Sequence, residues 1–550
     1  MNPLDLGGIW RDEEPGPRRV DLGRWSLELR RGGSLSNLTF SGVAVLRAVR
    51  GVLRDRDWRT APATVLDVTT RDGGLRVHGT FHDEGGEDVV DATWEIGARA
   101  DPGRLVVEFT ATTRRAFQRN RFGLVVLHRP DDAGTPLRVR HPDGAWTATQ
   151  FPVAIAPHQP ARDVAELRWS RPGVDVAVEF RGDVFEMEDQ RNWSDASFKT
   201  YSTPLSEPFP VRLEPGTVVH QQVVVRCAPN ALPVPVPARP TRVDLVVTDE
   251  PSPQWGSTSD VEGFAGPLLV ELVTADPEWL EVLERARRCG RPLDVRIVTD
   301  DPAEVGTVVD ATQGVEVLRF GVHSRTTHVS TPELWAALRT ACAGLPGDLV
   351  AGARSHFTEL NRTVEFLPAD ATGVVFASTP QMHDTGRDQV FEALAVQELT
   401  ARQAVAIGGG RPVHVGPVTL RPRFNAVATT PWRVDRDRVP RDPRRDGRGF
   451  AAWVIASAAA FAVPGVASVS FGDVDGSAAA GLRLLAGLDG SRRLRLAPGC
   501  VLAQGVHLIG GRGAGGDAVL VANLADDVRV VDLAGADLTL EPGEVRRHAG

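Results

Sequence analysis

The stretch VEVLRFGVHSRTTHVSTPELWAALRTACAGLPGDLVAGA, residues 315–353, decides the fold class of this chain. It begins and ends with short apolar runs (315–322 and 348–353), and the segment 331–344 between them has apolar residues at helical spacing. Near-continuous apolar strands that alternate with helices are typical of a parallel sheet covered by helices. We therefore predict one strand–helix–strand unit of such a sheet here.

The same alternation extends in both directions along the chain. Helical spacing recurs in segments such as PEWLEVLERARRCG and DQVFEALAVQELTARQ. Eight such units predict a (β/α)₈ barrel of the TIM type over residues 241–490, although the first helix is poorly marked because its segment is rich in Gly and Ser. The eight apolar runs are RVDLVV (242–247), LLVELV (268–273), LDVRIV (293–298), VEVLRFGV (315–322), DLVAGA (348–353), GVVFAS (373–378), PVHVGPV (412–418) and VASVSF (466–471).

The regions on either side of the barrel are rich in strands. Short runs with period-2 alternation, such as RLVVEFTAT and TVVHQQVVVR, predict an antiparallel β-sandwich over residues 1–228. The proline-rich segment 229–240 cannot continue a helix or a central strand, so we expect a linker there. Residues 491–550 return to strand patterns and predict a small C-terminal β module.

Composition excludes several classes of protein. A net charge of −9 argues against a nucleic-acid partner, since phosphate binding needs clustered positive charge. No run of about 18 apolar residues and no signal-peptide core are visible, so we expect no membrane partner and a cytoplasmic location. The four cysteines lie far apart, without the spacing of metal ligands. We expect no metal and no cofactor.

The loops that follow the barrel strands should carry the chemistry. They bring together carboxylate, imidazole and guanidinium groups, which can act as general base, general acid and anion stabiliser around a polyhydroxylated ligand. A lone Glu in such a loop can also be only a favourable charge at a helix N-terminus, and a lone His only a packing residue. The candidates are Glu359, Asn361 and Arg362 after the fifth run, Gln381, His383 and Asp384 after the sixth, Arg423 and Asn425 after the seventh, and Asp473 after the eighth.

One stretch of the sandwich also contains candidate site residues. FEMEDQRNWSDASFKTYSTPL (185–205) interrupts the strand pattern and includes the only lysine and the only tyrosine of the chain. Side chains of these types bind sugars, through aromatic faces for C–H groups and polar groups for hydroxyls. We predict that Asn192, Asp195, Lys199 and Tyr201 bind substrate. The alternative is a cluster of salt bridges that holds the sandwich to the barrel.

Five segments together resemble the D-apionate lactonase family: RDRDWRT (54–60), EDQRNWSDASFKTYSTPL (188–205), FTELNR (357–362), TPQMHD (379–384) and PVTLRPRFN (417–425). The resemblance implies hydrolysis of a branched-sugar aldonolactone to its open acid, in bacterial catabolism of the plant sugar apiose. The chain departs from the family pattern in FGDVDG (471–476), where an aromatic pair followed by Glu-Thr is expected. It also departs in LVELV (269–273), where a version with histidine and arginine is usual.

Lactone hydrolysis needs an activated water, a site for the oxyanion and a proton for the leaving oxygen. We predict Glu359 as the base, His383 oriented by Asp384 as the acid, and Arg362 or Arg423 at the oxyanion. No GxSxG elbow is visible, so no acyl-enzyme is expected. Two alternatives remain open: a glycoside hydrolase that uses Glu359 with Asp473, and a non-catalytic carbohydrate-binding protein.

Overall fold

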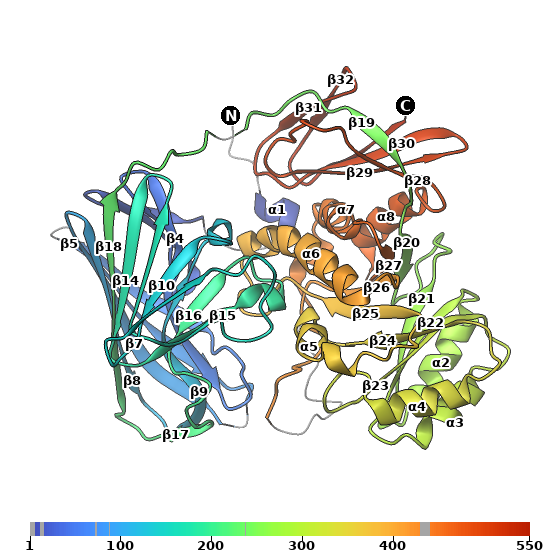
Figure 1. Cartoon of the computed structure of the whole chain (residues 1–550), viewed down its shortest axis with the longest axis horizontal. Coiled ribbons are helices and arrows are strands. Elements are labelled where there is room, and N and C mark those ends of the chain that lie inside the picture. Colours follow the sequence, from blue (N-terminus) through green and yellow to red (C-terminus); the bar gives the residue numbers. More distant parts are fainter. Residues whose placement is uncertain are drawn as a thin grey trace.

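Figure 1 shows two large bodies, an N-terminal β-sandwich and a barrel, with a third, smaller β layer above the barrel. This computed structural model describes residues 6–11, 16–71, 74–86, 88–236, 238–429, 441–472 and 474–549. The described residues between β18 and β19 have almost no regular structure, as the proline-rich sequence predicts, and this segment crosses the top of the view.

The predicted sandwich is confirmed as two antiparallel sheets of nine strands each. Alternate residues of each strand point into the shared core, where Trp25, Trp94 and Phe109 are buried. The first sheet has the order β1 (Arg18–Leu22), β2 (Trp25–Leu29), β3 (Leu35–Phe40), β4 (Val43–Asp55), β9 (Phe117–Leu127), β16 (Phe198–Tyr201), β15 (Phe185–Asp189), β12 (Ala161–Val164), with β17 (Val211–Leu213) beside β9. The second has the order β11 (Trp146–Gln150), β10 (Pro136–Arg140), β13 (Glu166–Arg171), β14 (Val174–Arg181), β18 (Val218–Pro229), β8 (Arg104–Thr113), β7 (Val90–Asp101), β6 (Gly74–Asp83), β5 (Ala63–Arg71).

The predicted barrel is present as eight parallel strands that close on themselves, because the first strand pairs with the eighth. The strands are β20 (Gln254–Ser257), β21 (Leu268–Val273), β22 (Leu293–Val298), β23 (Val317–His323), β24 (Asp348–Gly352), β25 (Gly373–Ser378), β26 (Val413–Val418) and β27 (Val466–Phe471). The helices are α2 (Trp279–Arg288), α3 (Glu304–Ala311), α4 (Pro332–Ala341), α5 (Phe357–Arg362), α6 (Arg387–Gly408), α7 (Phe450–Phe461) and α8 (Gly476–Ala486).

One predicted barrel strand was wrong. The run 242–247 does not enter the barrel, and its residues contribute to β19 (Leu245–Pro251), which pairs with β28 (Arg492–Leu496) in the C-terminal sheet. The true first strand, β20, is only four residues long and is followed by a loop over the fully described residues 258–267. Apolar alternation marks a strand but does not tell which sheet it joins.

The C-terminal module is a five-stranded sheet with a separate hairpin. The sheet contains β19, β28, β29 (Val506–Gly513), β30 (Gly516–Asn523) and β33 (Val545–Ala549), and the hairpin is β31 (Arg529–Leu533) with β32 (Ala536–Leu540). Its apolar face packs on α7. The remaining elements are α1 (Leu6–Trp10), η1 (Arg31–Gly33), η2 (Pro130–Asp132), η3 (Gln190–Trp193), η4 (Val364–Phe366) and η5 (Pro443–Asp446).

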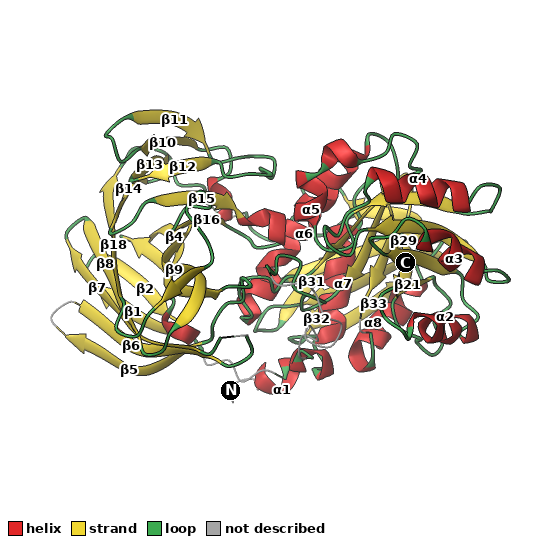
Figure 2. Ribbon diagram, turned by 90° about the horizontal axis from the view of Figure 1, so that it is seen from below, coloured by secondary structure: helices red, strands yellow, loops and turns green. Residues whose placement is uncertain are grey.

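The sandwich and the barrel meet along α5 and α6. Figure 2 shows the sheet that contains β15 and β16 on one side of this contact and the two helices on the other. Asn361 of α5 donates hydrogen bonds to the Ile155 carbonyl (3.1 Å) and to Asn192 Oδ1 (2.9 Å) of the sandwich. Arg47 of β4 forms an ion pair with Glu392 of α6. Among the described helices, none is long and apolar enough to cross a membrane.

Candidate active site

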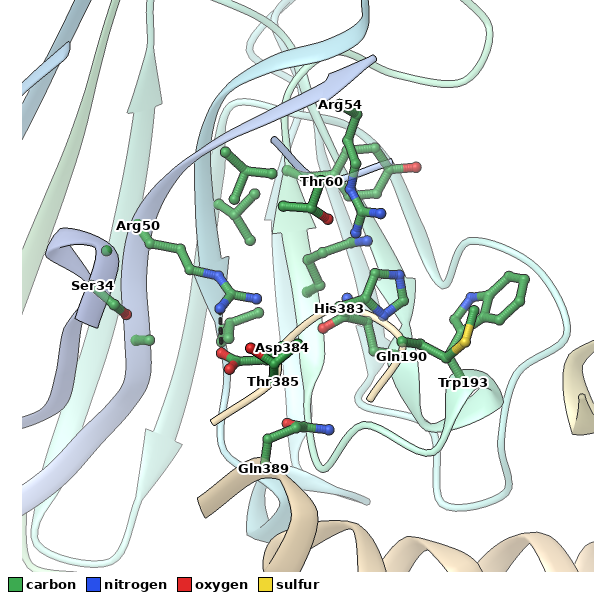
Figure 3. Close-up of a pocket in the computed structure, with 18 of the residues that line it drawn as sticks. Ser34, Arg50, Arg54, Thr60, Gln190, Trp193, His383, Asp384, Thr385 and Gln389 are labelled. Atoms are coloured by element: carbon green, nitrogen blue, oxygen red, sulfur yellow. Dashed lines mark hydrogen bonds and ion pairs between the residues drawn. The ribbon is translucent and has the colours of Figure 1, made fainter. Parts of the chain in front are cut away.

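A cavity of about 960 Å³ lies between the sandwich and the barrel. Strands β4, β9 and β16 form its sandwich side, and the segments after β25 and β26 form its barrel side. Figure 3 shows Arg50 and Arg54 extending from the sandwich toward His383 and Asp384 of the barrel. Among the described residues ten basic and five acidic side chains line the cavity, so its walls attract anions although the whole chain is acidic.

The arginines of β4 reach the cavity because of strand alternation. Val49 and Leu53 point into the sandwich core, whereas Ala48, Arg50, Val52 and Arg54 line the cavity. Sequence reasoning missed Arg50 and Arg54 because arginine that alternates with apolar residues also describes a solvent-exposed strand face. The signal in the sequence was that Arg54 is the first residue of the RDRDWRT segment.

Lys199 lies on the cavity wall in an ion pair with Glu188. The two residues are directly opposite each other in the β15–β16 pair, and their side-chain atoms are 2.6 Å apart. Glu188 also accepts a hydrogen bond from Trp193 Nε1 at 2.9 Å. Burial would raise the pKa of Glu188, but Lys199, together with His383 and Arg362, outweighs burial and holds this pKa well below its usual range. Burial lowers the pKa of Lys199. The ion pair with Glu188 fixes the ammonium group of Lys199 beside the cavity.

His383 is held by Asp195, which comes from the sandwich. Nδ1 of His383 bonds to Asp195 Oδ2, and Asp195 Oδ1 accepts a second hydrogen bond from Gln389 Nε2 at 2.7 Å. Nε2 of His383 makes no hydrogen bond to a described residue. Burial raises the pKa of Asp195 to about 7, and burial, with Lys199 and Arg54, lowers the pKa of His383 well below its usual value. The two groups therefore titrate as one coupled pair.

Asp384 does not orient His383, which corrects the predicted pairing. Its carboxylate is 2.5 Å from Arg50 Nη1 and accepts a hydrogen bond from the Gly386 amide. Against the effect of burial, Arg50 lowers the pKa of Asp384. Asp384 and His383 both line the cavity, but Asp384 is paired with Arg50 of β4, whereas His383 is paired with Asp195 of the segment between η3 and β16.

Glu359 is at the N-terminus of α5 and does not line the cavity. Its carboxylate accepts hydrogen bonds from Ser355 Oγ (2.6 Å) and from the His356 amide (2.9 Å), which is a capping box. Burial raises its pKa. Glu359 therefore has the position expected of a favourable charge at a helix N-terminus, the alternative to the role of base. It does not face the cavity in which a substrate fits.

Some of the other predicted site residues of the barrel line the cavity, and others lie at the contact between the domains. Arg362 lines the cavity, lies 3.8 Å from Glu188 and donates to the Pro157 carbonyl. Gln381 and Asn425 also line it, where Gln381 donates to Asp442 and Asn425 to the Asp57 carbonyl. Asn361 belongs to the interface described above. Asp473 lies outside the described residues.

Some residues of the EDQRNW…KTY stretch line the cavity, and others hold the sandwich to the barrel. Lys199 and Tyr201 line the cavity, and the hydroxyl of Tyr201 donates to Glu186, its cross-strand partner. Asn192, in contrast, donates to the Ala156 and Asp189 carbonyls and accepts from Asn361, so it holds the sandwich to the barrel. The stretch is therefore part site and part interface.

The barrel mouth, where such barrels usually bind substrate, is filled by charged side chains. Glu271 of β21 pairs with Arg354 (3.1 Å) and with Arg423, which explains why Arg423 is not in the large cavity. Burial would raise the pKa of Glu271, but these two arginines hold it well below its usual range. The space left beside Arg423 has a volume of about 10 Å³, too small for a sugar. No group of metal-ligating side chains is found in the described ranges.

Comparison with known proteins identifies the family. The N-terminal domain of D-apionate lactonase matches residues 8–230, and the TIM barrel domain of D-apionate lactonase matches residues 323–483. The chain belongs to the D-apionate lactonase family. It is 29% identical over 523 residues to the D-apionate lactonase of Brucella anthropi, with 86% of this chain and 85% of that protein covered. The resemblance in the five sequence segments is confirmed.

Solved structures share only limited geometry with this family member. A galactose mutarotase-like protein from Lactobacillus casei has 10% identity, covers 39% of this chain and 100% of its own, and gives a TM-score of 0.30. A GH30 endoxylanase from Clostridium papyrosolvens has 11% identity, covers 56% of this chain and 96% of its own, and gives a TM-score of 0.33.

Proposed function

We propose that this chain hydrolyses a sugar lactone to its aldonic acid in the cavity between sandwich and barrel, with D-apionolactone as the first candidate substrate. The observation that carries the proposal is the His383–Asp195 pair, which presents an imidazole to a cavity that Lys199 and Arg54 also line. The name of the Brucella anthropi relative supports the substrate class. In this role the enzyme acts in apiose catabolism.

His383 is the general base in this proposal, in place of Glu359. Asp195 accepts the Nδ1 proton of His383, which leaves the lone pair of Nε2 free to take a proton from water. The resulting hydroxide attacks the lactone carbonyl carbon. General-base assistance of this kind contributes about 10²- to 10⁴-fold to the rate.

Lys199 and Arg54 stabilise the oxyanion that forms in this step. Lys199 is fixed by Glu188, and Arg54 donates to the Trp58 carbonyl at 2.8 Å, so both cations are positioned before substrate binds. Preorganised donors at a developing oxyanion contribute about 10²- to 10³-fold each. When the intermediate collapses, the carbon–ring oxygen bond breaks and the departing oxygen takes the proton from Nε2 of His383. The products are a hydroxyl group and a carboxylic acid, which releases its proton to the solvent and becomes a carboxylate.

Polar groups around the cavity bind the hydroxyls of the sugar. Gln381 and Asn425 face the cavity from the barrel, Gln190 and Tyr201 face it from the sandwich, and Trp193 supplies an aromatic face. A cavity built from both domains can hold a polyhydroxylated ring on all sides.

The experiment is hydrolysis of D-apionolactone, followed by acid release, with wild type and His383→Asn. We expect the variant to lose about 10²- to 10⁴-fold in kcat because the base is absent. Thr385→Val, a change to a neighbouring cavity residue without a role in the proton transfers, is the matched control and should keep activity. Undiminished turnover by His383→Asn would remove the mechanism. Failure of wild type to open any sugar lactone would remove the function.

A further inference from the structure

The ion pair between Asp384 and Arg50 lies on the cavity wall and takes no part in the proposed proton transfers. Arg50 belongs to β4 of the sandwich. Asp384 follows the base His383 in the chain, so the Cα atoms of these two barrel residues are about 3.8 Å apart. Figure 3 shows the ion pair beside His383. A lactone whose carbonyl carbon reacts at His383 therefore lies within reach of this pair.

Asp384 is more accessible than the two other carboxylates that act on His383. Its side chain is 36% exposed, against 14% for Glu188 and 2% for Asp195. Burial nevertheless acts to raise the pKa of Asp384, and Arg50 outweighs this effect and lowers it. A carboxylate that small molecules can touch, although it is partly removed from bulk water, is a charged group on the wall of an internal cavity.

The contacts of Asp384 fix its carboxylate and leave acceptor sites for a ligand. Oδ2 lies 2.5 Å from Arg50 Nη1, and Oδ1 accepts a hydrogen bond from the Gly386 amide at 2.8 Å. An ionised carboxylate has about four lone-pair sites, so each oxygen can accept one more hydrogen bond. Two acceptor oxygens side by side match two hydroxyls on neighbouring carbon atoms.

Arg50 adds a hydrogen-bond donor beside these acceptors. The bond from Nη1 to Asp384 is the only side-chain hydrogen bond that it makes to a described residue, and its side chain is 16% exposed. Its second terminal nitrogen can therefore donate to a ligand. Since a hydroxyl both donates and accepts, it suits a carboxylate and a guanidinium that lie together. The charge of Asp384 at the same time repels an anionic group, so the pair favours a neutral polyol.

We propose that Asp384, held by Arg50, forms a diol site, which binds the hydroxyls on the two ring carbons that follow the lactone carbonyl. The inference rests on the proposed lactone hydrolysis and makes Asp384 a specificity-determining residue for polyhydroxylated lactones. An analogue without these hydroxyls places an apolar ring edge against a charged carboxylate, which then loses its hydrogen bonds to water without replacement.

The test compares two γ-lactones, erythronolactone, which has both hydroxyls, and γ-butyrolactone, which has neither. The readout is the ratio of the two kcat/KM values, because a change at the base, such as the loss of the Asp384 charge that acts on Asp195, affects both lactones alike. Wild type should favour erythronolactone. Asp384→Asn keeps the shape and removes the charge, so it should reduce the ratio at least about 10-fold, the value of one charge-assisted hydrogen bond.

Asp388→Asn is the matched control. Asp388 of α6 also lines the cavity and forms an ion pair between the domains, with Arg30 of the sandwich, so this change removes an equal charge and a similar link. We expect it to keep the wild-type ratio. A ratio that is unchanged in Asp384→Asn, or that falls equally in Asp388→Asn, would overturn the proposal, since the Asp384–Arg50 pair would then only hold the domains together.

Binding separates this inference from the function on which it rests. 1,4-Anhydroerythritol has the five-membered ring and both hydroxyls but no carbonyl, so it cannot be hydrolysed. If wild type opens no lactone, its affinity for wild type and for Asp384→Asn is measured by NMR titration. Binding at least about 10-fold weaker to the variant would show that the proposed hydrolysis fails and the diol site stands. No binding to wild type, or equal binding to both proteins, would overturn the diol site as well.

Discussion

At the scale of single residues, the pairing of each side chain decides its role. His383 is presented to the cavity by Asp195, a residue 188 positions away in the sequence, and not by its neighbour Asp384. Sequence reasoning selected His383, Asp195 and Lys199 from residue type and local context. It could not pair His383 with Asp195, because this contact forms only when the two domains dock. It also could not pair Lys199 with Glu188, because that pair depends on the register of β15 and β16.

The coupled pair predicts how the rate depends on pH. Above neutrality one proton lies between Asp195 and Nδ1, and Nε2 of His383 is free, whereas one more proton occupies Nε2 at lower pH. Since the pKa of Asp195 is raised to about 7, kcat/KM should rise with pH through a midpoint near that value. A pH profile of lactone hydrolysis, corrected for the spontaneous reaction, measures this. Asp195→Asn should lower the rate and abolish the inflection; a profile flat from pH 5 to 9 would contradict the assignment.

For Glu359, in contrast, we predict that substitution has little effect on catalysis. Glutamine at this position can also accept the bonds of a capping box, so Glu359→Gln should retain activity and lose less than about 1 kcal/mol of stability. Lactone hydrolysis and thermal unfolding of the variant measure the two effects. A loss of turnover comparable to that of His383→Asn would return Glu359 to the role of base.

At the scale of secondary-structure elements, the register of two strand pairs builds the site. The β15–β16 pair sets Glu188 against Lys199, and the β4–β9 pair sets Arg54 against Arg121. Apolar patterning predicted seven of the eight barrel strands, because a buried parallel strand is apolar along its whole length. The first barrel strand, β20, was not predicted because its sequence QWGS is short and contains Gly and Ser, which are also common in loops.

The contact between η3 and α5 should control the geometry of the cavity. Asn361 donates to Ile155 and Asn192 and accepts from Gln403, so Asn361→Ala leaves buried groups unpaired, at a cost of about 1–3 kcal/mol. We expect a lower unfolding temperature and a higher KM, measured by calorimetry and steady-state kinetics. Gln313→Ala, an exposed change on the barrel, is the control. An unchanged unfolding temperature in Asn361→Ala would show that this contact does not hold the domains together.

At the scale of the whole molecule, neither domain contains the site alone. The barrel mouth is closed by Glu271, Arg354 and Arg423, and the open space lies instead against the sandwich. The sandwich supplies Lys199, Asp195, Arg50 and Arg54, and the barrel supplies His383. Local patterns predicted both folds, but the location of the cavity follows from how the two bodies pack, which no local pattern encodes.

The central claim is that catalysis takes place at the contact between the domains, and lactone hydrolysis by two variants tests it most directly. Lys199→Met with Glu188→Gln removes the ammonium without leaving a buried unpaired carboxylate, and Glu359→Gln alters only the barrel. The account predicts a loss of about 10²- to 10³-fold in kcat for the double variant and near wild-type kcat for Glu359→Gln. Full activity in the double variant together with an inactive Glu359→Gln would contradict it.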